Sequence, residues 1–242
     1  MKTAKNLLAA AALGVGLLSA STANATLTSV DGGLLVYDSV KNITWLANAN
    51  LGATNTFGVS GIHVTPGVFG TPVGGMNWYT AQNWIAAMNA ADYLGFNTWR
   101  LPTTPAYNEP GACSAVNPHC TASEMGELFF NELGGVAHNA NWNLFQNLQT
   151  AYGGIYWSGT VDTYHPGNAW SFEMSTGWQG DATQNSFLFA MAVLPGDVFG
   201  AVQTSATAQT SGAVPEPGTA WLLGLGLLGF AGVARRRSSF TV

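Results

Sequence analysis

The distribution of basic residues constrains this chain more than any other feature. Of seven Lys and Arg residues, two precede the apolar run Leu7–Leu18 and three directly follow the apolar run Thr219–Ala234, which leaves two for all of residues 26–213. Basic residues beside an apolar run are typical of segments that a membrane handles during export. The pattern therefore predicts one folded body between two separate signals.

Residues 1–25 have the features of a secretory signal peptide. Two lysines precede the apolar run, and Ala23-Asn24-Ala25 places small residues at the positions that signal peptidase recognises. We therefore predict export through the Sec translocon and cleavage before Thr26. A retained membrane anchor is the alternative, but the apolar run is short for one.

Residues 214–237 contain three parts in a fixed order. The motif Pro215-Glu216-Pro217 comes first, the uncharged run Thr219–Ala234 follows, and the basic cluster Arg235, Arg236 and Arg237 comes last. As a helix this run would be about 24 Å long, less than the roughly 30 Å hydrocarbon core of a bilayer. The arginines would hold its end in the cytoplasm, with the body outside. A plain membrane anchor is the alternative interpretation.

This order resembles the PEP-CTERM sorting signal of Gram-negative bacteria. The resemblance implies that an exosortase, a membrane protease, recognises Pro215, Glu216 and Pro217 and removes the tail. It also implies transient inner-membrane anchoring, followed by delivery to the cell surface or the exopolysaccharide matrix. Residues 198–213 are uncharged and mostly small or polar, which predicts a flexible linker between the body and this signal.

The charge of the body excludes one class of partner. Two basic and 11 acidic residues give residues 26–213 a formal charge of −9. Such a surface repels phosphate backbones, so we expect no nucleic-acid binding. Disorder is not expected either, because 9 Trp, 12 Phe and 7 Tyr form a large apolar content that folding can bury.

Strand patterns occur in both halves of the body, which we assign to residues 26–197. In the first half, Leu34–Tyr37 and Ile43–Leu46 flank a turn-like segment and predict a hairpin. The second half has three more patterns with β-branched or aromatic residues, at 155–157, 170–174 and 187–194. The last of these is apolar enough to be a central strand.

Two helices are predicted between these strands. Apolar residues recur at helical spacing over 78–90, and Asn77 precedes them as a candidate N-cap. Thr121 and Glu124 fit a capping box that would begin a second helix, and Gly134 would end it. Together the elements predict an α+β fold with two helices and a mostly antiparallel sheet, plus one C-terminal hydrophobic helix in the tail.

Five short motifs of the body resemble the DUF1566 (Lcl C-terminal-like) domain: Trp99–Thr103, Ser123–Phe129, Tyr156–Thr160, Ala169–Phe172 and Ala192–Asp197. The resemblance covers roughly residues 30–197. It implies a C-type-lectin-like mixed fold, no catalytic residues to carry over, and association with polysaccharide, which the founding surface proteins of the family bind. Many members have an arginine near the end of the last strand, where this chain has Leu194, so a site that depends on that arginine would be absent.

The lone arginine of the body and the two cysteines are candidate special residues. Arg100 could bind an anionic or sugar-carboxylate ligand beside Trp99, or form a structural ion pair with Glu124, Glu127 or Asp92. Cys113 and Cys120 are expected to form a disulfide in an exported protein, worth roughly 2–3 kcal/mol. No metal site is expected from them, because zinc needs four ligands.

Aromatic and acidic side chains supply the remaining candidates. Tyr164 and Trp178 are expected to be exposed and to stack on glycan rings. Six other aromatic residues are expected in the core, namely Trp45, Trp78, Trp84, Trp99, Trp157 and Trp170. Loops of the second half also hold residue types that bind Ca²⁺, namely Asp162, Asn168, Asp181, Asn185 and Asp197. Because no calcium-loop motif is present, calcium is an open alternative and no cofactor is predicted.

The sequence thus predicts an exported, exosortase-sorted surface protein with a non-catalytic body that associates with extracellular polysaccharide. Two alternatives stay open. One is a purely structural matrix protein without a saturable ligand. The other is a secreted glycan hydrolase, which would need a pair of carboxyl groups drawn from Glu124, Glu127, Glu173 and Asp181.

Overall fold

The computed structural model describes residues 27–66, 71–106 and 119–200. The predicted signal peptide, most of the linker and the C-terminal signal with its hydrophobic helix lie outside these ranges. The chain divides into two compact units, residues 1–196 and residues 197–242, and the fold given below is that of the first.

Within the described ranges, the structure contains no helix with the length and apolarity needed to cross a membrane.

A four-stranded antiparallel sheet forms from both ends of the first unit, in the order β1-β2-β3-β7. Its strands are β1 (Leu27–Val30), β2 (Leu35–Asp38), β3 (Ile43–Leu46) and β7 (Val193–Pro195). The predicted hairpin of β2 and β3 is confirmed, and its turn closes through Asn42, whose φ is +51°. Asn tolerates this left-handed conformation better than most residues. β1 was not predicted, because its sequence LTSV has two polar residues in the middle and only Leu27 is buried.

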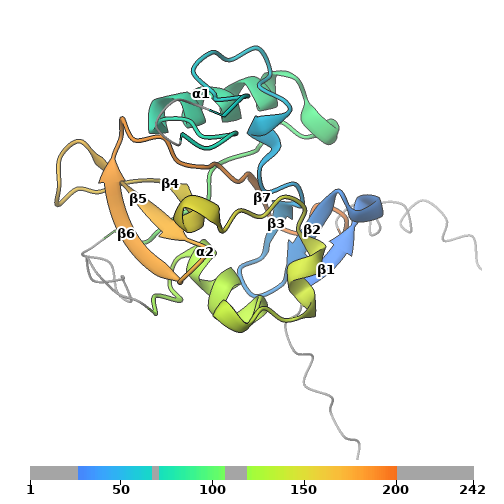
Figure 1. The fold of residues 1–242 in the computed structure, drawn as a ribbon. Helices are drawn as coiled ribbons and strands as arrows, with labels where there is room; N and C mark the ends of the chain where they lie inside the picture. Colours follow the sequence, from blue (N-terminus) through green and yellow to red (C-terminus); the bar gives the residue numbers. More distant parts are fainter. Residues whose placement is uncertain (1–26, 67–70, 107–118, 201–242) are drawn as a thin grey trace, which may run out of the picture. The chain divides into compact units, whose positions relative to one another are not determined.

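A separate three-stranded antiparallel sheet holds β4 (Ile155–Val161), β5 (Asn168–Glu173) and β6 (Trp178–Thr183), in that order. The antiparallel pairing therefore divides over two sheets instead of one. β6 was missed because its sequence WQGDAT is polar and shows no apolar alternation. Its residues nevertheless pair with β5 along its whole length. Figure 1 shows the two sheets on opposite sides of the unit.

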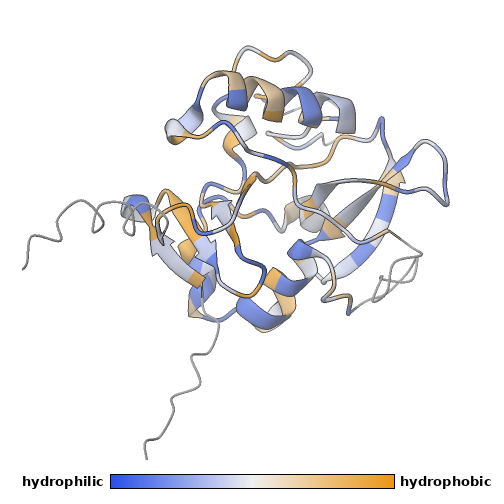
Figure 2. Cartoon of the chain, turned by 180° about the vertical axis from the view of Figure 1, so that it is seen from behind, coloured by the Kyte–Doolittle hydropathy of each residue, from blue (hydrophilic) through white to orange (hydrophobic). Residues whose placement is uncertain are grey.

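The first predicted helix is confirmed as α1, Trp78–Ala90. The Asn77 side chain accepts a hydrogen bond from the Thr80 backbone N–H and caps the helix. The buried face consists of Ala81, Trp84, Ile85 and Met88, and in Figure 2 the helix alternates between hydrophobic and hydrophilic colours accordingly. Burial of this stripe against the rest of the unit fixes the position of α1.

The second helix begins later than predicted. Ser123, and not Thr121, is the N-cap of α2 (Glu124–Glu127), and its hydroxyl accepts from the Gly126 N–H. The proposed capping box is therefore wrong. The helix continues as a π-helical turn, Leu128–Glu132, and the chain leaves it through Gly134 at φ +78°, as the glycine rule predicts.

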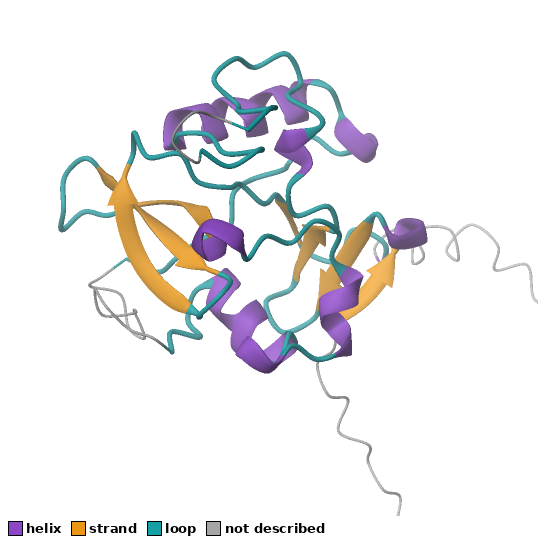
Figure 3. Ribbon diagram, in the orientation of Figure 1, coloured by secondary structure: helices purple, strands orange, loops and turns teal. Residues whose placement is uncertain are grey.

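The segment predicted as one last strand, 187–194, instead joins the two sheets. The Phe189 backbone exchanges hydrogen bonds with Ile155 and Trp157 of β4. Further along, Val193 exchanges two with Arg100 and enters β7. Figure 3 shows this loop-like path between the strands of the two sheets. Only the final residues are a regular strand, because each earlier part pairs with a different neighbour.

The predicted α+β class with two helices is confirmed. The core lies where the sheets meet α2, and it includes Trp45, Phe129, Tyr156 and Phe172. Five of the six tryptophans assigned to the core are buried: Trp45, Trp84, Trp99, Trp157 and Trp170. Trp78, the first residue of α1, is only partly buried, and its indole N–H donates to the Ser158 carbonyl of β4.

Candidate functional site

Four polar side chains meet where the β4–β5 connection rises from the three-stranded sheet. Asp162 follows β4, His165 lies in the connection, Asn168 begins β5, and Asp181 lies on β6. The register explains the meeting: Trp170 of β5 is opposite Asp181, so Asn168, two residues earlier on the same face, is its diagonal neighbour. Together with Tyr164 these residues form what we call the β4–β5 loop site.

His165 bridges the two carboxylates of the site. Its Nδ1 lies 2.7 Å from Oδ2 of Asp162 and 3.5 Å from Oδ2 of Asp181. The Asn168 amide donates a short hydrogen bond to the same Asp181 oxygen. The hydrogen bond to Asp162 is the main cause that raises the pKa of His165, and Asp181 adds to it. When the imidazole is protonated, it balances part of the negative charge here.

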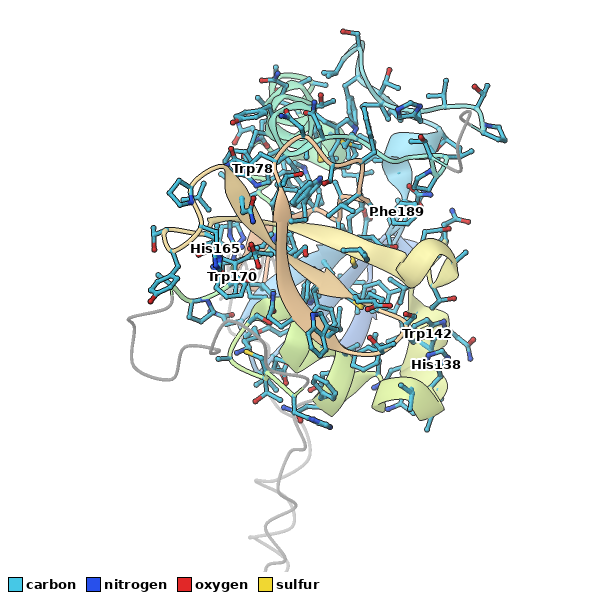
Figure 4. All side chains as sticks on the ribbon, turned by 60° about the vertical axis from the view of Figure 1, so that its left-hand side comes forward. Trp78, His138, Trp142, His165, Trp170 and Phe189 are labelled. Carbon is cyan, nitrogen blue, oxygen red and sulfur yellow. The ribbon has the colours of Figure 1, made fainter. Side chains whose placement is uncertain are left out.

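Tyr164 lies at the outer edge of the site. The other oxygen of Asp162 accepts a hydrogen bond from the Tyr164 backbone N–H at 2.8 Å, which fixes the loop. The Tyr164 side chain is 67% exposed, and its ring meets the His165 ring edge-on at 5.7 Å. Figure 4 shows His165 beside Trp170, far from the stacked pair of His138 and Trp142. The site thus combines an accessible aromatic face with hydrogen-bonding groups.

Arg100 is occupied within the fold. Its two terminal nitrogens contact the two oxygens of Glu124 at 2.8 and 2.6 Å, and Oε2 also accepts from the Thr103 N–H at 2.7 Å. The Arg100 side chain is 34% exposed and that of Glu124 is 12% exposed. The structural ion pair is therefore the correct interpretation of Arg100. Through Arg100 and Thr103, the motif Trp99–Thr103 holds Glu124, the first residue of α2.

A family model for the Lcl C-terminal domain matches residues 34–193, about two thirds of the chain. The chain belongs to this family. A second model, for the PEP-CTERM protein-sorting motif, matches residues 213–237. That motif implies recognition by an exosortase, export with membrane-anchored transit, and a surface destination. A comparison with curated proteins found no match.

The loop site of this Lcl C-terminal domain contains only some of the residues proposed for calcium. Asp162, Asn168 and Asp181 come together. Asn185 is exposed in the turn after β6. Asp197 belongs to the second unit, where it accepts from the Phe199 and Gly200 N–H groups. His165 was missed, although its spacing of three residues from Asp162 was a usable signal.

The two aromatic candidates lie on different parts of the sheet. Trp178 is 43% exposed, as expected, but it begins β6 opposite Glu173. The β4–β5 loop site lies at the other end, near Thr183, which is about 17 Å away along the strand. The two side chains therefore do not form one platform, and only Tyr164 has a cluster of polar groups beside it.

The cysteine and sorting residues fall partly outside the described ranges. Cys120 is buried and is not a free thiol, whereas Cys113 lies outside, so the bridge between them stays a prediction. The sorting residues Pro215, Glu216, Pro217 and Arg235–Arg237 also lie outside, as does the predicted cleavage site.

The Lcl C-terminal domain also contains a second acidic group that the sequence did not indicate. Asp38, Glu127 and Glu132 are all buried, and their carboxylate oxygens lie within 4.8 Å of one another. Burial is the largest cause that raises the pKa of Glu127 from 4.5 to about 7, followed by Asp38 and Glu132, while Lys41 and the Asn131 side chain lower it in part. The folded protein therefore holds a proton that the unfolded chain releases near pH 4.5.

This proton predicts a fall in stability as pH rises. In the presence of a chelator, the contribution is complete below the unfolded pKa of Glu127 and is lost as pH passes its folded value. We expect the free energy of unfolding to drop by about 2 kcal/mol between about pH 5 and about pH 8, less than the full shift converts to because neighbouring carboxyl groups share the proton. Urea titrations of the parent and of Glu127→Gln at both pH values measure it.

The comparison of parent with variant isolates Glu127 from other groups. The pKa of His165 is also raised, so the stability that its protonation contributes is lost as pH rises above the ordinary histidine pKa. This loss is the same in the parent and in Glu127→Gln. A parent that loses no more stability than Glu127→Gln over this range would contradict the prediction.

Proposed function

We propose that this domain associates non-catalytically with extracellular polysaccharide, and that the β4–β5 loop site binds the glycan. The PEP-CTERM motif supplies the location, because an exosortase-sorted protein reaches the surface where such polymers are. We further propose that the C-type-lectin-like fold expected from the sequence describes this body. Within the site, Tyr164 stacks on a sugar ring, and His165, Asn168 and Asp181 exchange hydrogen bonds with its hydroxyl groups. The buried Asp162 carboxylate orients His165 and the loop.

The single observation that carries the proposal is the exposed ring of Tyr164, which lies edge-on to His165 at the border of this polar cluster. Sugar binding needs an apolar face for the C–H side of the ring and fixed donors and acceptors for the hydroxyls. The Asp162 side chain is only 2% exposed and is held by two hydrogen bonds. Such a group is already ordered before a ligand arrives, which reduces the entropy lost on binding.

The contacts of the carboxylates support a non-catalytic role. A glycosidase needs two carboxyl groups that flank one bond. Glu124 is taken up by Arg100 and Thr103, and Glu127 is buried at 3% exposure. Glu173 accepts from Ser175 at the end of β5 that is remote from Asp181. Of the four residues considered for hydrolysis, two therefore lie on α2 with different surroundings, one ends β5 and one lies on β6.

Tyr164→Ala is expected to weaken polysaccharide binding about tenfold, because loss of one stacking contact removes roughly 1.4 kcal/mol. Binding of the purified exported protein to immobilised bacterial polysaccharides measures it, with Trp178→Ala as the matched aromatic control, which should bind like the parent. Both side chains are exposed, so neither change should unfold the protein.

Other outcomes of this experiment separate the alternatives. The absence of saturable binding to any polysaccharide would favour a purely structural matrix protein. Release of reducing sugar during the incubation would favour a hydrolase. Equal loss in both variants would show that the binding surface is not the β4–β5 loop site.

A further inference from the structure

Three carboxylates from different elements are buried together in the first unit. Asp38 ends β2, Glu127 ends α2, and Glu132 ends the π-helical turn that continues α2. Their exposed fractions are 0%, 3% and 5%. The cluster therefore lies where the β2–β3 hairpin meets the helical segment, and solvent does not screen its charge.

Two of these carboxylates have protein donors. Oδ1 of Asp38 accepts from the Val40 and Lys41 N–H groups at 3.0 Å, and Oδ2 accepts from the Trp45 indole N–H at 3.4 Å. Glu132 accepts a hydrogen bond from the Leu27 backbone. These bonds orient both side chains but do not neutralise them.

Glu127 differs, because neither of its buried oxygens has a partner in hydrogen-bond geometry, although the Asn131 side chain acts on it as a donor and lowers its pKa in part. The nearest cation does not pair with it either. The Lys41 ammonium donates instead to the backbone carbonyls of Thr121 and Ala122, at 3.3 and 3.2 Å. A buried carboxylate with two unsatisfied oxygens costs free energy unless a group other than these protein contacts satisfies it.

We propose that Asp38, Glu127 and Glu132 bind one calcium ion, which joins the β2–β3 hairpin to the helical segment. Calcium takes oxygen ligands at 2.3–2.6 Å, so two oxygens on opposite sides of the ion are about 5 Å apart. The oxygens of the cluster lie within 4.8 Å of one another, which suits this ion. Three carboxylates offer the charge that a hard divalent cation needs, and one oxygen of Glu127 lies in the cluster without a partner in hydrogen-bond geometry.

The β4–β5 loop site does not need a cation to satisfy its carboxylates. There the imidazole of His165 lies 2.7 Å from Asp162, and Asn168 donates to Asp181. The protein itself thus supplies the partners of both carboxylates, and a positive charge when His165 is protonated. For this reason the ion is assigned to the buried cluster, although both groups contain at least two acids.

Terbium luminescence tests the assignment, because the Trp45 indole donates to Asp38 and can transfer excitation to a bound ion. We expect Tb³⁺ added to the purified exported protein to emit on excitation of tryptophan, and Ca²⁺ to abolish the emission by competition. Saturating Ca²⁺ should also raise the melting temperature by about 5 °C. Glu127→Gln should weaken Tb³⁺ binding at least tenfold and lose the melting shift.

Glu173→Gln is the matched control, because it makes the same chemical change outside the cluster and should respond to Ca²⁺ like the parent. If Glu127→Gln does not fold, as judged by near-ultraviolet circular dichroism, Glu132→Gln replaces it with the same expectation. A parent without a calcium response would overturn the proposal. So would a response that survives both cluster variants, or one that Asp162→Asn removes instead.

Discussion

Replacing Arg100 with leucine will lower the free energy of unfolding by about 3 kcal/mol. Glu124 would keep the Thr103 N–H on Oε2, but Oε1 would lose the Arg100 nitrogen that donates to it. The Glu124 side chain is only 12% exposed. An uncompensated buried carboxylate is the reason for the large effect. The value lies at the lower end for buried pairs because the Arg100 side chain is one third exposed. Urea denaturation followed by tryptophan fluorescence measures it.

The double variant Arg100→Leu/Glu124→Gln separates the charge from the packing. A neutral amide needs less compensation than a carboxylate, so the double variant should recover at least about 1 kcal/mol of the loss. If the double variant is as unstable as Arg100→Leu alone, then lost contacts of the arginine stem, and not the orphaned charge, explain the destabilisation.

Gly177→Ala is expected to be nearly as damaging, at about 3 kcal/mol. Gly177 connects β5 to β6 at φ +80°, and an added Cβ would overlap the Phe130 ring and approach a Phe129 ring carbon to 2.6 Å. Phe129 is a core residue with no exposed surface. The variant therefore combines an unfavourable backbone conformation with overpacking of the core.

Gly58→Ala is the control that removes one of these two effects. Gly58 has the same φ of +80°, but an added Cβ there meets nothing within 4 Å. Its expected loss is about 1 kcal/mol, from the backbone alone. Thermal unfolding of both variants gives the comparison. Equal losses would mean that the aromatic pair moves aside freely, and that the packing argument fails.

The spacing of apolar residues predicted those elements that bury one face and expose the other. The stripe of Ala81, Trp84 and Met88 gave α1 to within a residue, and the Asn77 cap gave its start. The pattern failed where contacts are two-sided or polar. β6 exposes Trp178 and buries Gln179, so it does not alternate as strands usually do. The path of Phe189 to Val193 depends on neighbours far away in the sequence, which no local pattern contains.

The candidate sites were harder to predict than the fold, because topology creates them. The sequence offered Asp162 and Asp181 as candidate calcium ligands. That His165 contacts both of them follows only from the register of β5 and β6. Asp38 and Glu127 are 89 residues apart, and each looks like an ordinary polar residue of a turn or a helix. Only the packing of the hairpin on α2 reveals that both are buried.

The most direct test of the account is a chemical-shift titration of the ¹⁵N-labelled exported protein with the polysaccharide that it binds best. The account predicts that the largest shifts occur in the backbone amides of Tyr164, His165 and Asn168, together with Asp181 across the sheet. Largest shifts around Trp178 or on α1, with the β4–β5 loop site unchanged, would contradict the proposed glycan-binding role of this site.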